Sequence, residues 1–144
     1  MELNECINFQ LSNAQNAVFH YFKIMLSPYD VTPIQYALLK CLWTEDMQPP
    51  TQLAQTLRLD TSTVSGLLER LEKKGLIERI YNTQDRRGIH VHLLERGATL
   101  QEPVERAIIE ANKEITAGIS SEALAIFRQQ LKVIENNAKP GNQV

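Results

Sequence analysis

The residues from 51 to 94 limit the possible folds more than any other part of the sequence. Two short segments with apolar residues at helical spacing, 52–59 and 62–74, precede two segments rich in strand-forming residues, 76–82 and 89–94. The polar loop TQDRRG joins the two strand segments, which predicts a β-hairpin. Two short helices joined by a tight turn and followed by a hairpin are typical of a winged helix-turn-helix unit.

Residues at the ends of these segments support the same architecture. Thr51 is placed to cap the first short helix, and Asp60 or Thr61 to cap the second. Gly75 supplies the left-handed residue that ends the second helix. An earlier helix is predicted over PIQYALLKCLW, and because this segment is apolar nearly all round, we expect it in the core.

Apolar stripes in the flanking parts of the chain predict three more helices. The first spans 3–26, the second begins near 95 and carries its stripe to Ile119, and the third follows the sequence GISS. Pro103 lies within the second stripe and predicts a kink or a late start of the regular helix. The middle lobe is too small to cover these stripes, so we expect a homodimer with twofold symmetry.

The predicted fold class is therefore mainly α (α+β). We expect one domain of 144 residues, in which 31–97 form a winged helix-turn-helix lobe with a two-stranded β-wing. Residues 1–30 and 98–138 are predicted to form a helical dimerisation region, and 139–144 a disordered tail.

Composition excludes several classes of protein. No apolar run approaches the ~18 residues of a transmembrane helix, and the first residues do not resemble a secretory signal. We therefore expect a cytoplasmic protein with no membrane partner. Two cysteines are too few for a disulfide framework. Because no catalytic triad, phosphate-binding glycine loop or metal-ligand spacing is present, we expect neither an enzyme nor a bound cofactor or metal.

The charge of the chain is unevenly distributed. The net charge is −2, yet residues 58–96 hold eight basic and six acidic side chains, so this segment is +2 and the remainder −4. A basic middle in an acidic chain suggests a local surface for a polyanion such as double-stranded DNA.

The second short helix carries the main candidate surface. Val64 and Leu71 share its apolar face, whereas the other face is rich in hydroxyl and basic residues. Hydroxyl groups at the start of such a helix can enter a major groove, bond base edges or meet phosphates. The candidate DNA-binding residues of this helix are Thr61, Ser62, Thr63, Ser65, Gly66, Arg70 and Lys73.

The hairpin loop carries the second candidate surface. Arg86 and Arg87 lie at its tip, and arginine inserts readily into the narrow, negative minor groove. Asp85 lies two residues before Arg87 and could hold that guanidinium in one direction. The alternative is an exposed turn kept soluble by its charges.

The segment STVSGLLERLEKKGLIERIYNTQDRRGIHVHLLERG, residues 62–97, resembles the core of the MarR family of bacterial transcriptional regulators. The helix running into the first wing strand, the D-x-R of the wing and the L-x-E-x-G exit all agree in order and spacing. The resemblance implies a homodimer on a pseudo-palindromic operator, with the helix in the major groove and Arg87 in the minor groove. It also implies repression that a small, often aromatic, ligand relieves.

Three positions depart from the family pattern. Gly66 stands where many members carry an arginine that grips DNA, and Arg70 could substitute one turn later. Arg58 occupies the turn between the two short helices, where a glycine is common, and would need an uncommon backbone conformation. Leu94 replaces a threonine, so the cap before the long helix is lost.

Candidate sensor residues fall into two groups. The resemblance places His20, Tyr21, Tyr29 and Tyr36 where a ligand cleft lies in this family, although packing alone would also explain them. Cys6 lies on the first helix, as does the reactive cysteine of a peroxide-sensing subgroup.

Two alternatives to a ligand-controlled repressor therefore stay open. One is a thiol-based redox regulator of the same fold. The other is a winged-helix protein-interaction module that no longer reads DNA, which the glycine at position 66 would favour. His90 and His92 point to the same face of a strand, but they lack further ligands nearby for a metal site.

Overall fold

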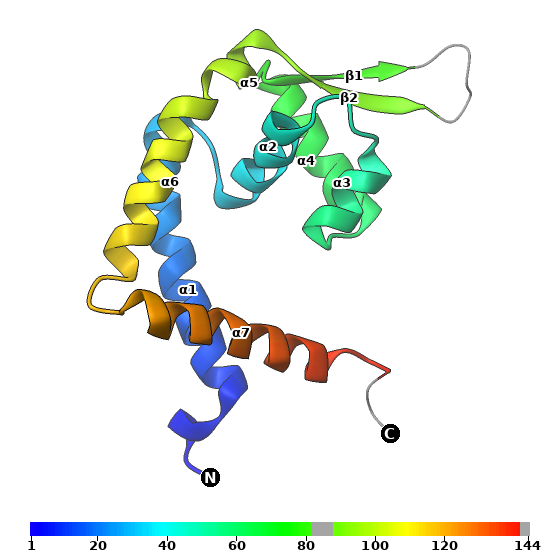
Figure 1. Ribbon diagram of the computed structural model, residues 1–144. Helices are drawn as coiled ribbons and strands as arrows, with labels where there is room; N and C mark the ends of the chain where they lie inside the picture. Colours follow the sequence, from blue (N-terminus) through cyan, green and yellow to red (C-terminus); the bar gives the residue numbers. More distant parts are fainter. Residues whose placement is uncertain (82–87, 142–144) are drawn as a thin grey trace. The chain divides into compact units, whose positions relative to one another are not determined.

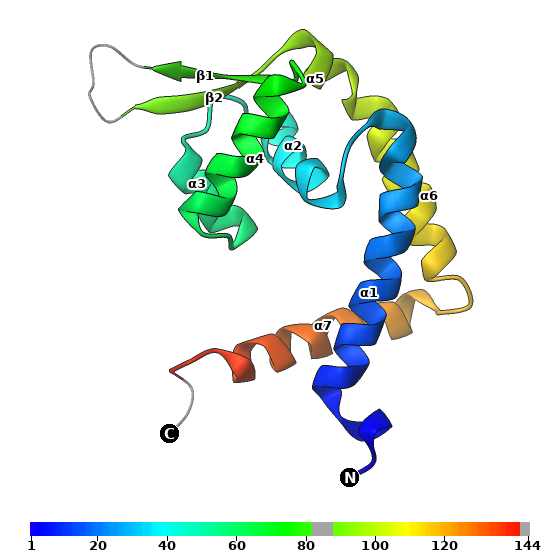
Figure 2. The same cartoon turned by 180° about the vertical axis from the view of Figure 1, so that it is seen from behind.

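The structure is a computed structural model that describes residues 1–81 and 88–141. The chain divides into two compact units, Met1–Ala111 and Asn112–Val144. Figures 1 and 2 show the order of elements along the chain. The described elements are η1 (Leu3–Glu5), α1 (Ile7–Leu26), η2 (Ser27–Tyr29), α2 (Pro33–Thr44), α3 (Pro50–Leu57), α4 (Thr61–Lys73), β1 (Ile77–Tyr81), β2 (Ile89–Leu93), α5 (Glu95–Thr99), α6 (Gln101–Ile115) and α7 (Ser121–Ala138).

The winged helix-turn-helix lobe has its own hydrophobic core. Helices α2, α3 and α4 and the hairpin each contribute fully buried side chains to it. Leu38, Leu53, Leu68 and Val91, one from each of these elements, are at most 1% exposed. Burying four such side chains contributes several kcal/mol, roughly 2 kcal/mol each, and this burial fixes the position of α4.

The wing is an antiparallel two-stranded hairpin. Its register pairs Ile77 with Leu93 and Tyr81 with Ile89. The chain segment between α2 and α3 lies along the other edge of β2, where the backbone N–H of Val91 donates to the Gln48 carbonyl oxygen at 2.9 Å. One edge of the wing is thereby paired, which limits the open edge that a hairpin would otherwise present.

A second hydrophobic cluster joins α1 to α6. Leu26, at the end of α1, is fully buried against Val104 and Ile108 of α6, and Phe22 and Leu100 pack beside them. In both views α1 and α6 run side by side (Figures 1 and 2). This cluster connects the long helices of the unit Met1–Ala111 to its winged helix-turn-helix lobe.

The unit Asn112–Val144 contains the end of α6 and the whole of α7. The hydroxyl of Ser120 caps α7 by accepting from the Ala123 N–H at 3.1 Å. All residues of α7 are described, and none of them is buried within the chain. Phe127 is 54% exposed although it is a large apolar side chain.

Most of the predicted elements are confirmed, with two corrections. Thr51 does not cap α3, because Pro50 occupies the first helical position and Pro49 becomes the N-cap. The first helix is interrupted at Cys6, which separates a short 3-10 turn from α1. Pro103 lies in the first turn of α6, so the predicted late start of that helix is correct. Residues 142–144 of the predicted tail lie outside the described part.

Among the residues that the structure describes, none of the helices has the length and apolar character needed to cross a membrane.

Candidate nucleic-acid interface

Helix α4 has one buried face and one exposed face. Its buried residues are Val64, Leu67, Leu68 and Leu71. The predicted DNA-binding residues Thr61, Ser62, Thr63, Ser65, Arg70 and Lys73 are all exposed, and Gly66 is partly exposed. The predicted residues of this helix are therefore all accessible, and none of them belongs to its buried face.

Asp60 organises the start of α4. Its carboxylate accepts from the Thr63 backbone N–H and from the Ser62 hydroxyl, both at 2.7 Å. These hydrogen bonds, that of Ser62 above all, lower the pKa of Asp60 to about 2. Because a carboxylate of the chain already occupies this helix terminus, a DNA phosphate is not the partner expected there. Because the Ser62 hydroxyl donates its hydrogen bond to Asp60, its oxygen remains available as an acceptor for an incoming group.

The two cations predicted on α4 have different surroundings. Lys73 forms an ion pair with Glu69, one turn earlier, at 3.3 Å, and both side chains are well exposed. Arg70 has no ion pair with any residue that the structure describes. Arg70 can therefore meet a phosphate or a guanine edge without first leaving an ion pair with a described residue.

The turn before α4 has an uncommon backbone conformation, as predicted. Arg58 has φ 55° and ψ 44°, in the left-handed region that glycine adopts most easily. Its side chain is exposed.

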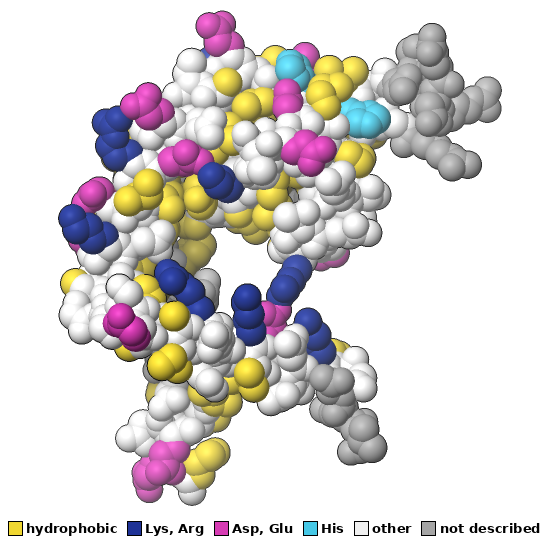
Figure 3. All heavy atoms as spheres, in the orientation of Figure 1, with side chains coloured by type: hydrophobic (Ala, Val, Ile, Leu, Met, Phe, Trp, Pro, Cys, Tyr) yellow, Lys and Arg dark blue, Asp and Glu magenta, His cyan; other side chains and the backbone are white. Residues whose placement is uncertain are grey.

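Two acidic side chains attach the wing to its lobe, and sequence reasoning missed both. Asp46, between α2 and α3, accepts from the Leu93 backbone N–H and contacts His92 Nδ1, each at 2.8 Å. Glu72 of α4 pairs with Arg79 of β1 at 2.8 Å, which lowers the pKa of Glu72. Figure 3 shows the histidine side chains over the hairpin with acidic side chains nearby. In the sequence, Asp46 is only an acidic residue in a loop, and such residues are too common to identify this contact.

The predicted wing residues Asp85, Arg86 and Arg87 lie outside the described residues. The strands that lead to them end at Tyr81 and begin again at Ile89.

A cavity of about 190 Å³ lies behind the end of α4. It is lined by Tyr29, Asp30, Lys74, Leu76, Arg96, Thr99 and Leu100. Lys74 Nζ donates to the Asp30 carbonyl oxygen at 2.6 Å and to Gln35 Oε1 at 3.0 Å. Gln35 is buried and belongs to the capping box of α2. One lysine at the end of α4 thus connects that helix to the segment between α1 and α2.

The predicted cleft residues have different positions. Tyr29 lines the cavity, and Tyr36 packs against Trp43 with ring centroids 6.3 Å apart. Burial raises the pKa of Tyr36. His20 is exposed and Tyr21 half-buried on α1.

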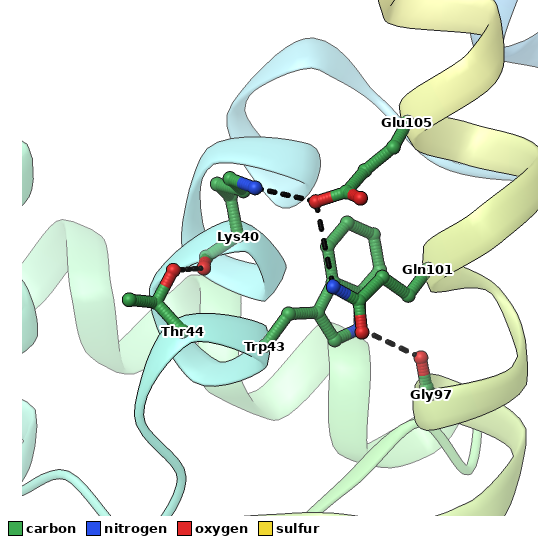
Figure 4. A network of polar contacts seen from close by, with 6 residues as sticks. All are labelled: Lys40, Trp43, Thr44, Gly97, Gln101 and Glu105. Carbon is green, nitrogen blue, oxygen red and sulfur yellow. Dashed lines mark hydrogen bonds and ion pairs between the residues drawn. The ribbon is translucent and has the colours of Figure 1, made fainter.

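Polar contacts connect α2 to α5 and α6 (Figure 4). Trp43 Nε1 donates to the Gly97 carbonyl oxygen at 2.9 Å, and Lys40 pairs with Glu105. This ion pair lowers the pKa of Glu105.

The cysteines are both free and partly exposed. Cys6 is the N-cap of α1. Burial raises the pKa of the Cys41 thiol, which disfavours its thiolate. Within 1–81 and 88–141, no cluster of three or more His, Cys, Asp or Glu residues is arranged to hold a metal ion.

Comparison with known proteins agrees with this architecture. The model described as MarR family matches residues 31–89. The HTH-type transcriptional regulator MgrA of Staphylococcus aureus is 34% identical over 106 residues, which cover 73% of this chain and 72% of MgrA. The multiple antibiotic resistance protein MarR of Salmonella typhimurium is 32% identical over 110 residues, 76% of each chain.

Solved structures share the fold. CouR from Rhodococcus jostii RHA1 bound to p-coumaroyl-CoA has a TM-score of 0.82 at 23% identity, covering 97% of this chain and 99% of CouR. CouR bound to a 23-mer DNA duplex has a TM-score of 0.85 at 24% identity, covering 93% and 95%. The fold therefore defines a winged helix-turn-helix protein. Within that class, the identity to MgrA and MarR shows that the chain belongs to the MarR family of transcriptional regulators.

Proposed function

We propose that this chain is a sequence-specific repressor that binds a pseudo-palindromic operator as a homodimer and that a small molecule releases it. The observation that carries the DNA-binding part is the exposed face of α4, where hydroxyl groups and Arg70 lie opposite four buried residues. In helix-turn-helix proteins the second helix lies in the major groove with its first residues at the base edges. CouR, which shares the fold, has a solved structure bound to a 23-mer DNA duplex.

The proposed dimer is supported by apolar side chains that the chain leaves uncovered. Phe19 on α1 and Ile126 and Phe127 on α7 are between 45% and 57% exposed. Large apolar side chains in such numbers favour an interface with a second copy.

DNA binding is tested by selecting bound duplexes from a random library and measuring affinity for the selected sequence against salt. We expect one enriched, pseudo-palindromic sequence. Arg70→Ala should weaken binding and flatten the log-salt slope by roughly one unit for each phosphate that the arginine neutralises. Arg87→Ala should do the same if the wing reaches the minor groove as proposed.

Arg106→Ala is the matched control, since Arg106 pairs with Glu102 on α6 and lies on neither proposed DNA surface. Selection of no sequence by the wild-type chain would reject the proposed function. Recovery of a protein partner in place of DNA would then favour the interaction-module alternative.

The proposed effector site is the cavity behind α4. Lys74 and Arg96 provide two cationic side chains, and Leu76 and Leu100 provide apolar walls. A small aromatic carboxylate matches this combination of groups. Its carboxylate would compete with Asp30 for Lys74, whose ammonium lies 3.4 Å from Asp30 Oδ1. Because Lys74 is the C-cap of α4, this competition would change how α4 is held.

Thermal shift with a panel of aromatic carboxylates tests the effector proposal, because a ligand of the folded form raises the melting temperature with concentration. We expect a ligand that also lowers operator affinity, and loss of both effects in Lys74→Gln. Lys40→Gln is the control, because Lys40 is a paired lysine outside the cavity lining. A shift caused by peroxide and absent in Cys6→Ser would instead support the redox alternative.

A further inference from the structure

Gly66 has no explanation within the chain. It lies in the interior of α4, where glycine is the least favourable residue after proline. Its backbone is helical and is not among the positive-φ glycines Gly75, Gly118 and Gly141. A Cβ atom built on Gly66 would meet nothing within 4 Å. Neither the backbone conformation nor internal packing therefore requires a glycine here.

The position of Gly66 on α4 indicates that a partner outside the chain requires the glycine. Gly66 is one turn from both Ser62 and Arg70, and it faces away from the buried Val64 and Leu68. It therefore lies in the middle of the strip of α4 that would face the major groove. We refer to Ser62, Gly66, Arg70 and Lys73 as the groove strip.

The surface that Gly66 presents is apolar. In the interior of an α-helix the backbone N–H and C=O groups bond to residues one turn away, so they are not available to a base. What remains at Gly66 is the pair of Cα hydrogens, at the level of the helix backbone itself. The apolar group that the major groove offers to such a surface is the C5-methyl group of thymine.

We propose that Gly66 is the point at which the α4 backbone comes closest to the base pairs, and that it seats the methyl group of one thymine in each operator half-site. This inference depends on the DNA binding proposed above. A Cβ atom at position 66 would occupy the space of that methyl group. The absence of a side chain is then a specificity determinant.

The test adds a methyl group to the protein at position 66 and, separately, removes a methyl group from the DNA. Gly66→Ala should melt at a higher temperature than the wild type, because alanine favours the helix, yet bind the selected operator about 5- to 100-fold more weakly. Each thymine of the operator is then replaced by deoxyuridine, which lacks the C5-methyl, symmetrically in both half-sites. At one position the wild type should prefer thymine, whereas Gly66→Ala should prefer uracil and recover most of the missing affinity.

Arg106→Ala is the control, since Arg106 pairs with Glu102 on α6, lies on neither proposed DNA surface, and should leave the preference for thymine unchanged. Binding of Gly66→Ala to the thymine operator with wild-type affinity would overturn the inference. Weaker binding that no uracil position restores would also overturn it. If the wild type selects no operator at all, the proposed function fails before this inference is reached, so the two failures are distinguishable.

Discussion

Asp60 has two roles at the start of α4. Its carboxylate satisfies the Thr63 N–H that the helix leaves unbonded, and it also accepts a hydrogen bond from the Ser62 hydroxyl. A residue that caps the helix therefore determines the hydrogen-bonding character of a neighbouring residue on the groove strip. If Ser62 contacts a base as proposed, helix stability and base recognition are coupled through this one side chain.

The coupling has a pH signature. The folded-state pKa of Asp60 is about 2, below its usual 3.8, so the ionised carboxylate stabilises the fold above about pH 4. That contribution should disappear as the pH falls from about 4 to 2. Melting temperatures between pH 2 and 5 should therefore fall more steeply for the wild type than for Asp60→Asn, which keeps the cap without titrating. Equal pH dependence in the two proteins would contradict this assignment.

Packing within the chain requires a glycine at position 97, whereas it does not at position 66. A Cβ atom there would lie 2.2 Å from the Leu76 carbonyl oxygen and 2.8 Å from Leu93 Cδ1. Gly97→Ala should therefore lower the free energy of unfolding by about 1–3 kcal/mol or more, because the backbone must move. Urea denaturation measures this change. Gly66→Ala, the same substitution in open space, should have the opposite sign, and equal effects would refute both explanations.

At the scale of elements, the wing is held by its neighbours and not by the hairpin alone. Gln48 pairs with Val91 along one edge, and the buried Gln48 amide donates to the carbonyl oxygens of Cys41 and Glu45. Glu72 of α4 holds Arg79 on the other strand. The direction of the wing is thereby tied to α2 and α4.

Removal of Asp46 should loosen this attachment. Asp46→Ala deletes the acceptor of the Leu93 N–H and the partner of His92, so it should destabilise the wing by about 1 kcal/mol, since both side chains are partly exposed. Amide hydrogen exchange should become faster at Leu93, and operator affinity should fall. Asp46→Asn, which keeps one oxygen acceptor, should lie between wild type and Asp46→Ala. Unchanged exchange at Leu93 would show that the edge pairing by Gln48 suffices.

How far the sequence predicts these elements depends on the range of the interactions that define them. The ends of α4 were predictable because Asp60 and Gly75 act within one turn of the helix. Asp46 was not predictable, since its partner His92 is 46 residues away and neither residue is unusual for its segment. The end of α3 shows a third case, where the left-handed Arg58 followed from the expected turn geometry although its residue type argues against it.

At the scale of the whole molecule, the uncovered apolar surface of α7 favours a dimer over a monomer. Phe127→Glu places a charge where we propose that two chains meet, so it should favour the monomer and lower the melting temperature. Analytical ultracentrifugation over a range of concentrations measures the change. Gln130→Glu adds the same charge at an exposed polar residue of α7 and is the control. A Phe127→Glu protein that stays dimeric would place the interface elsewhere.

The absence of any buried side chain on α7 has a consequence for gene dosage. If DNA binding requires two chains, operator occupancy below the dimerisation constant depends on the square of the chain concentration. Halving synthesis would then reduce occupancy roughly four-fold by mass action, before any effector is present. The amount of protein that the cell makes would thus itself control how much operator is occupied. A mutation that only weakens the α7 surface would lower operator occupancy in the same way as reduced expression of the regulator's own gene.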